Sequence, residues 1–363
     1  YRDVRAEYPP LAFVPILTAF YISDTLGGFF DGFEAVFAIE MYLLALAGGM
    51  TAWSIGRRVM PAAHERELGR RLVVYVAGFL LLGQVVTTRF DLVPAVLMAG
   101  ALACWLRRRE GFGWALLAAG VATKLFPVVL APLFAIDLLA RRGWLAALRG
   151  GLIFLGWCVV GFLPGLLASP DGLREALTYH SERGTQIEGA WANSLLILNH
   201  LTGLQVGTDN VFGAFEAISS WTDELKVISV LAQVVALGVV YLTFAWLAGQ
   251  ARSETEWARS LLLASLLALA AFIIFGKVFS PQYLIWLMPL AVVVPGRHGR
   301  WALVLFLGTL ALSQAIFPYA YDALRDRTGP AVLLLTARNL TFIAFAAVVA
   351  IAYRRTFTHD LRR

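Results

Sequence analysis

Cysteine is nearly absent from this chain of 363 residues, which contains only Cys104 and Cys158. Both lie inside apolar runs, so the sequence supports neither a disulfide framework nor a cysteine metal site. Metal-binding His/Cys spacings and Asp-x-Asp pairs are also missing, and we expect no metal and no other cofactor. Without a Walker loop or a dinucleotide glycine fingerprint, nucleotide binding has no motif to support it.

Charged residues are also scarce, at 15% of the chain, whereas soluble globular proteins average about 25%. The mean hydropathy is +0.72. Apolar runs of about 15 to 25 residues recur along the whole length, which is typical of a helical protein that crosses a membrane many times. The formal charge of +6 comes from short cationic clusters between these runs. We therefore expect membrane lipids as neighbours, a cell-membrane location and no nucleic-acid partner.

The apolar runs predict an all-α polytopic membrane protein with about eleven transmembrane helices in a single domain, 1–363. The run at 9–22 is short, and its role as a span or as a re-entrant segment stays open. Residue 1 is not Met and no signal peptide precedes the first run, so one missing N-terminal helix would bring the number to about twelve. The expected spans are 33–55, 72–86, 92–106, 114–122, 128–139, 150–168, 227–246, 260–275, 284–294, 301–317 and 331–353.

Arginine-rich loops set the expected direction of each helix. Clusters such as 107–109 and 141–142 mark cytoplasmic loops, which leaves the polar and acidic connections on the outer side. Only three of the 30 basic residues are lysines, and all three fall on that outer side, where a cation is expected to bind an anion. The outer loops are 1–32, 87–91, 169–225, 276–283 and 318–330, and the lysines are Lys124, Lys226 and Lys277.

The most polar stretch is 179–188, which follows the apolar run 150–168. The predicted topology brings it to the same side as the lysines and several carboxylates. Such a set suits a lipid that carries a phosphate and a sugar, because cations bind the phosphate and a carboxylate accepts a proton from an attacking hydroxyl. The residues of this set are Asp3, Glu7, Arg89, Asp91, Lys124, His180, Arg183, Gln186, Glu188, Lys277, Gln282 and Tyr283.

Several of these charged residues also have a purely structural interpretation. Arg338 lies about two turns inside the last span, where a cation costs roughly 2.5–3.5 kcal/mol. It either belongs to the substrate site or pairs with a helix-buried acid such as Glu40. Lys124 and Lys277 can extend to the membrane interface, and Asp91 can cap the helix that follows it.

Five motifs occur in the order known from glycosyltransferase family 87, and the chain resembles that family over nearly its whole length. The motifs are Tyr1-Arg2-Asp3 with Glu7-Tyr8-Pro9-Pro10-Leu11, Arg89-Phe90-Asp91-Leu92, Lys124-Leu125-Phe126-Pro127, Tyr179-His180 with Arg183-Gly184 and Gln186-Ile187-Glu188, and Phe279-Ser280-Pro281-Gln282-Tyr283.

The resemblance implies a GT-C membrane glycosyltransferase that transfers a hexose or pentose, often mannose, with inversion. The donor would be a polyprenyl-phosphate sugar, the acceptor a lipid or glycan, and the active site extracytoplasmic. Family members usually place a catalytic Asp in the first outer loop. Asp3 is the Asp available there, Glu7 is the second candidate, and an Asp upstream of residue 1 is the third. The resemblance assigns Lys124 and Arg183 to the donor phosphate, with His180 near the leaving phosphate or the acceptor.

Two other classes of protein fit parts of the sequence. A transporter or flippase of a lipid-linked saccharide is the alternative, although it would need two related halves or helices broken at the midplane, and no internal repeat is evident. A metal-dependent prenyltransferase would need Asp-rich motifs, which the sequence lacks. The donor sugar, the acceptor and the oligomeric state stay open.

Overall fold

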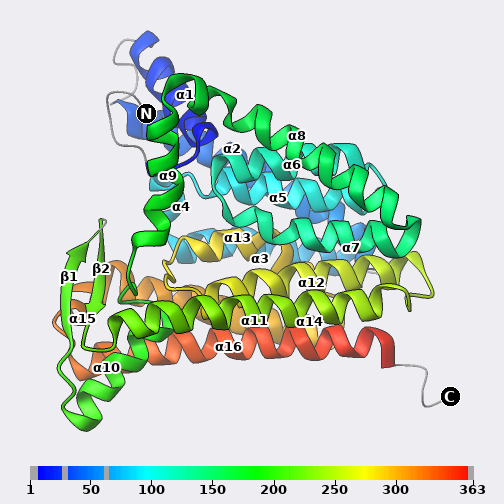
Figure 1. The fold of residues 1–363 in the computed structure, drawn as a ribbon. Helices are drawn as coiled ribbons and strands as arrows, with labels where there is room; N and C mark the ends of the chain where they lie inside the picture. Colours follow the sequence, from blue (N-terminus) through cyan, green and yellow to red (C-terminus); the bar gives the residue numbers. More distant parts are fainter. Residues whose placement is uncertain (1–6, 27–31, 61–64, 212, 359–363) are drawn as a thin grey trace.

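The computed structural model describes residues 7–26, 32–60, 65–211 and 213–358, apart from the side chains of 180–182 and 358. It shows a bundle of helices with one small sheet (Figure 1). In chain order the elements are η1 (Pro10–Ala12), α1 (Phe13–Thr25), α2 (Phe33–Val59), α3 (Glu65–Leu82), α4 (Val85–Thr88), α5 (Leu92–Trp105), α6 (Glu110–Thr123), η3 (Phe126–Leu130), α7 (Ala131–Arg142), α8 (Trp144–Ala168), α9 (Pro170–Glu182), α10 (Ala190–Thr202), β1 (Gly207–Val211), β2 (Ala214–Ile218), α11 (Thr222–Ala248), α12 (Glu254–Phe275), α13 (Tyr283–Ala291), α14 (Gly296–Gln314), η4 (Ala315–Ala320), α15 (Tyr321–Arg325) and α16 (Gly329–Thr358).

Six helical segments of the described chain are long and apolar enough to cross a membrane. They are α2, α8, α11, α12, α16 and the segment Gly296–Arg325 that contains α14 and α15. An all-α membrane protein is therefore confirmed. The five other expected spans fall on α3, α5, α6, α7 and α13, which contain 18, 14, 14, 12 and 9 residues. Eleven crossings stay a prediction, because a straight helix needs about 20 residues to cross the hydrocarbon core.

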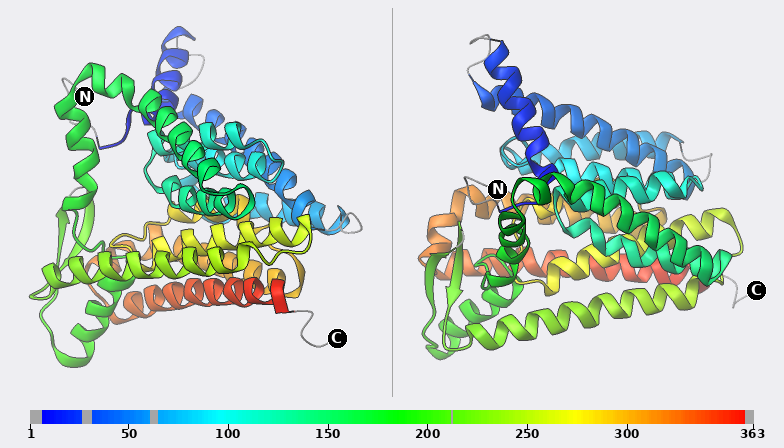
Figure 2. Two further views of the ribbon diagram at one scale, coloured as in Figure 1. Left: turned by 45° about the vertical axis from the view of Figure 1, so that its right-hand side comes forward. Right: turned by 45° about the horizontal axis from the view of Figure 1, so that its top comes forward.

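Helix α12 forms the centre of the bundle. In its most apolar window 72% of the residues are buried, whereas the corresponding share is 11% in α8 and in α11. Helix α12 packs against α11 on one side and α16 on another, and α16 packs against α14; these helices run side by side in Figures 1 and 2. Because α8 and α11 expose leucine and valine along most of their length, their outer faces are suited to contact with lipid.

One end of the bundle carries a network of arginines, and we call it the arginine end. Arg108 pairs with Glu254 at 2.7 Å, and Arg141 pairs with Glu110 at 3.0 Å. Buried Asp137 accepts hydrogen bonds from two indoles, those of Trp105 and Trp257, each at 2.7 Å. These contacts tie the end of α5 to the ends of α7 and α12 that lie beside it, so the arginines predicted to share one side are neighbours.

The opposite end of the same helices holds the irregular elements, and we call it the cavity end (Figure 1). Strands β1 and β2 pair in antiparallel register, with Gly207 opposite Ile218 and Val211 opposite Ala214. The sequence did not predict this hairpin, which lies within the expected outer loop 169–225. A second apolar cluster anchors these elements and includes Ile187, Leu196, Ala217, Ile316, Leu324 and Leu335.

Close helix packing fixes the position of α8 on α6. A Cβ atom at Gly161 would lie 2.6 Å from the Cβ of Ala122, a distance that neither backbone can relieve by a rotamer change. At Gly156 on the same helix, a Cβ would meet no described atom within 4 Å. Glycine is therefore needed at the first position for helix contact and not at the second.

We expect Gly161→Ala to lower the free energy of unfolding by about 1–3 kcal/mol, because the added methyl pushes α8 away from α6. Gly156→Ala is the matched control and should be neutral or slightly stabilising, since alanine favours the helix. Thermal unfolding of both variants in detergent measures the difference. Equal unfolding temperatures in the two variants would contradict the packing argument.

Candidate active site

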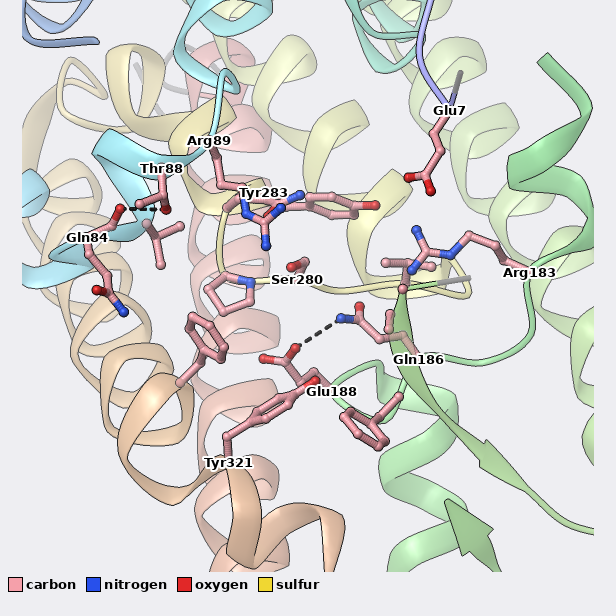
Figure 3. A pocket seen from close by; sticks show the side chains of 18 of the residues that line it. Glu7, Gln84, Thr88, Arg89, Arg183, Gln186, Glu188, Ser280, Tyr283 and Tyr321 are labelled. Atoms are coloured by element: carbon pink, nitrogen blue, oxygen red, sulfur yellow. Dashed lines mark hydrogen bonds between the residues drawn. The ribbon is translucent and has the colours of Figure 1, made fainter. Parts of the chain in front are cut away.

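A cavity of about 380 Å³ opens at the cavity end of the bundle. Five separate parts of the chain supply its polar side chains (Figure 3): the N-terminal segment, residues 84–89 around α4, the segment 183–189, residues 280–283 at the start of α13, and α15. The polar and aromatic residues that line it are Glu7, Tyr8, Gln84, Thr88, Arg89, Arg183, Gln186, Glu188, Phe215, Ser280, Gln282, Tyr283, Phe317 and Tyr321.

Two backbone hydrogen bonds hold the segment 183–189 at the cavity wall. The amide of Gln186 donates to the carbonyl of Lys277 at 3.0 Å, and the amide of Ile187 donates to the carbonyl of Phe215 at 2.9 Å. The Glu216 carboxylate accepts the Gly184 amide at 2.8 Å. The segment thus lies between β2 and the α12–α13 connection, which explains why residues about 90 positions apart in sequence share one wall.

The guanidinium groups of Arg89 and Arg183 extend into the cavity from different walls, and Glu7 extends toward Arg183 from the N-terminal segment (Figure 3). The Nε atom of Arg183 is buried without a hydrogen-bond partner among the described residues. Two arginines with free donors are suited to an anionic group, above all a phosphate, which they bind by charge-assisted hydrogen bonds.

Glu7 is also bonded to a tyrosine of the neighbouring helix α9. Burial, together with the hydrogen bond to Glu7 and its charge, raises the pKa of Tyr179 to about 12. Tyr179 therefore stays protonated at neutral pH and donates its hydroxyl hydrogen to the carboxylate, which orients Glu7 at the rim of the cavity.

The opposite wall carries a buried carboxylate and amide. Gln186 Nε2 donates to Glu188 Oε2 at 3.0 Å. Gln186 Oε1 and Glu188 Oε1 are buried without a hydrogen-bond partner among the described residues. Arg338 lies behind them: it is fully buried, donates to the backbone carbonyl of Glu188 at 2.7 Å, and stacks 3.8 Å from the Phe279 ring. The interpretation that Arg338 pairs with Glu40 is therefore wrong, and Arg338 supports the cavity wall without lining it.

Lys124 and Asp91 form a buried ion pair behind the cavity rather than free side chains within it. Lys124 Nζ lies 2.8 Å from Asp91 Oδ1, and the indole of Trp286 donates to the same oxygen at 2.7 Å. Asp91 occupies the N-cap position of α5, as the sequence predicted, but its side chain makes no capping hydrogen bond to the helix. The carboxylate is already engaged by the lysine and the indole.

Aromatic rings separate this ion pair from the cavity. The Lys124 ammonium lies 5.4 Å from the ring centre of Tyr8 and 5.9 Å from that of Tyr283, and both of these residues line the cavity. Phe90 and Trp286 surround the ammonium at 5.3 and 5.6 Å. The ammonium of Lys124 thus acts on the cavity through its electrostatic field and through the positions of the Tyr8 and Tyr283 rings.

Lys277 lies behind Arg183 and is bonded to its backbone. Its Nζ donates to the carbonyl of Arg183 at 2.7 Å, and it does not line the cavity. Burial lowers the pKa of Lys277, as does the nearby charge of Lys226, while Glu216 opposes the shift. Gln282 and Tyr283 lie on the cavity wall, on the same side as Arg89 and Arg183, as the sequence predicted.

Two predicted residues stay untested. Asp3 lies outside the described residues, and so does the side chain of His180. Sequence reasoning also missed lining residues, among them Gln84, Phe215, Phe317 and Tyr321. Of these, Phe215 and Tyr321 carried a signal, since they fall in the predicted outer loops 169–225 and 318–330.

The fold and the cavity define a membrane protein with a polar, arginine-lined site at one end of its helices. The sequence matches the family described as glycosyltransferase family 87 over residues 7–275, and the chain belongs to this family. Comparison with curated proteins gave no match. The family identifies the protein as a membrane glycosyltransferase and confirms the resemblance predicted from the five motifs.

Replacing one partner of the buried ion pair should destabilise the protein more than replacing both partners with apolar residues. We expect Asp91→Leu alone to lower the free energy of unfolding by about 3–5 kcal/mol, because it leaves a buried ammonium unpaired. The double variant Asp91→Leu/Lys124→Met should recover at least half of that loss. The exposed pair of Asp223 and Lys226 is the control, and its replacement should change the free energy by less than about 1 kcal/mol. Additive single and double losses in unfolding measurements would contradict the pairing.

Glu188 should make stability depend on pH. Burial raises the pKa of Glu188 from an ordinary 4.5 to about 7, and Arg338 of α16 opposes the shift. Tyr321 of α15 and Tyr283 of α13 also face this group across the cavity. Between pH 4.5 and 7 the folded protein holds a proton that the unfolded chain has released, so stability falls as pH rises.

Relative to Glu188→Gln, which keeps a neutral group at that position, the wild type should lose about 3 kcal/mol of unfolding free energy over this interval, at roughly 1.4 kcal/mol per pKa unit. Thermal unfolding of both proteins across the interval measures the change. A difference between the two that does not vary with pH would show that Glu188 titrates normally.

Proposed function

We propose that the protein transfers a sugar from a polyprenyl-phosphate donor to a lipid or glycan acceptor, with inversion, on the extracytoplasmic side of the cell membrane. The observation that carries this proposal is one cavity in which Arg89 and Arg183 face the carboxylates of Glu7 and Glu188. A mannose or another hexose or pentose is the expected sugar, and family membership supports the transferase activity itself.

In the proposed reaction an acceptor hydroxyl oxygen attacks the anomeric carbon of the donor sugar, and the bond between that carbon and the phosphate oxygen breaks. A carboxylate accepts the hydroxyl proton, and Glu7 is the described candidate, with Asp3 as the other. Arg89 and Arg183 bind the phosphate and stabilise the charge that grows on it as it leaves. Because phosphate is a good leaving group, the reaction needs no strong general acid.

The structure revises the expected role of Lys124 within this proposal. Its ammonium is paired with Asp91 and separated from the cavity by Tyr8 and Tyr283, so it positions the wall and contributes a long-range positive field. Arg338 and Lys277 support the wall in the same indirect way. The donor phosphate is therefore assigned to the two arginines that line the cavity.

The extracytoplasmic assignment follows from the separation of the two ends. The arginine end matches the expected cytoplasmic loops, and the cavity lies at the opposite ends of α5 and α12. A flippase of a lipid-linked saccharide remains the alternative function, and it would use the same phosphate-binding residues.

We expect Arg183→Ala and Arg89→Ala each to reduce sugar transfer by roughly 100- to 1,000-fold, the loss typical of removing a donor that stabilises a developing anion. The assay incubates the purified protein with a panel of polyprenyl-phosphate sugars and a membrane lipid extract, and detects products by mass spectrometry. Arg174→Ala, an exposed arginine of α9 outside the cavity, is the control. Wild-type turnover in both cavity variants would refute the phosphate assignment.

The same protein in proteoliposomes separates transferase from flippase. Formation of a glycosidic product supports the transferase, whereas movement of the intact lipid across the bilayer without product supports the alternative.

A further inference from the structure

The two unpartnered oxygen atoms of Gln186 and Glu188 form a second binding element within the cavity, and we propose that they receive two hydroxyl groups of the donor sugar. This inference rests on the proposed function, because it divides the same cavity into a phosphate part and a sugar part. The sugar part is formed by the Gln186–Glu188 pair with Tyr321 (Figure 3) and by Phe317, whose ring centre lies 5.2 Å from that of Tyr321.

The geometry of the pair leaves one acceptor on each side chain. Gln186 Nε2 donates to Glu188 Oε2 at 3.0 Å, which fixes the orientation of the amide and presents its oxygen on the other side. Gln186 Oε1 and Glu188 Oε1 are both buried and lack a hydrogen-bond partner among the described residues. The two side chains are 5% and 2% exposed, so bulk water does not readily satisfy these oxygens.

The chemistry of the pair selects hydroxyl groups over phosphate. Gln186 Oε1 is an acceptor, and so is Glu188 Oε1 when the carboxyl is ionised, above its pKa of about 7. An ionised phosphodiester offers no hydrogen to donate, whereas each hydroxyl of a sugar offers one. The ionised form of Glu188 also repels an anion. The arginines on the facing walls have the opposite preference, since a guanidinium only donates. The cavity thus has an anion-binding part and a part that accepts hydrogen bonds from a neutral polyol.

The position of the pair assigns it to the donor sugar. In a sugar phosphate the ring is joined directly to the phosphate oxygen, so the ring must lie in the same cavity as a phosphate held by Arg89 and Arg183. The cavity of about 380 Å³ is confined. The rings of Phe317 and Tyr321 line it beside Glu188 and can pack on the apolar face of a sugar. Arg338 donates to the backbone carbonyl of Glu188 at 2.7 Å and thereby fixes the backbone that carries the carboxyl group.

The test compares two ligands, polyprenyl-phosphate mannose and polyprenyl phosphate, which share the lipid and the phosphate group. The first is a diester and the second a monoester with a higher negative charge, so the ratio of their affinities for the purified protein in lipid nanodiscs includes a charge effect. The change of this ratio from wild type to variant measures the contribution of the replaced side chain to sugar binding. We expect this ratio to fall by roughly 10- to 100-fold in Gln186→Leu, which is the effect of losing a hydrogen bond to a strong acceptor. Polyprenyl phosphate should bind the variant as tightly as the wild type.

Two variants of Glu188 and one control variant distinguish a lost hydrogen bond from a loss of structure. Glu188→Gln keeps an acceptor oxygen and should lower the ratio less than Glu188→Leu does. Gln205→Leu, at an exposed position between α10 and β1, is the control and should leave the ratio unchanged. Retained affinity for polyprenyl phosphate shows that each variant is folded.

Two results would overturn the inference, because each leaves the ratio unaffected: unchanged affinities for both lipids in Gln186→Leu and Glu188→Leu, or an equal loss of affinity for both lipids. The proposed function fails differently, since it fails when the wild type forms no glycosylated product from any donor of the panel. The binding ratio can be measured in either case.

Discussion

The buried ion pair between Lys124 and Asp91 is the contact on which the site depends. It joins the end of α6 to the start of α5, and the Trp286 indole adds α13 to the same carboxylate. Burying two charges costs solvation energy, and close pairing with further hydrogen bonds and surrounding rings offsets that cost. Because the pair is surrounded by Tyr8 and Tyr283, its position determines where the aromatic wall of the cavity lies. An interaction outside the cavity thus sets the shape inside it.

The cavity is lined by several side chains that have hydrogen-bond donors or acceptors without a partner among the described residues. Within the described part of the chain, Arg183 retains an unused donor, while Gln186 and Glu188 retain unused acceptors. Buried polar groups without partners are costly to a fold, and they are retained in a cavity where a ligand can complete them. Donors face the cavity from Arg89 and Arg183 and acceptors from the other wall. This division matches a ligand with an anionic and a hydroxylated part, which is the composition of a sugar phosphate.

Sequence reasoning found most of the polar residues of the cavity but assigned several of them the wrong neighbours. Arg89, Arg183, Gln186 and Glu188 were predicted and do line one cavity. Lys124 was expected to be free and is paired, because the burial that made a lysine unusual there also requires a counter-charge. The hairpin β1–β2 was missed, since its two five-residue strands carry no clear alternation and lie within a polar segment.

The sequence by itself determined the class of the protein, its helical character and the separation of arginine-rich ends from a polar end. These follow from the composition and spacing of apolar runs, which obey the same physical limits in any membrane protein. Only the tertiary structure decided which charges are satisfied and which are free. That outcome depends on distances of a few ångströms between side chains far apart in the chain, such as Lys277 and Arg183 or Arg338 and Glu188. Hydropathy and loop charge place a residue on a side of the membrane, but they do not select its partner.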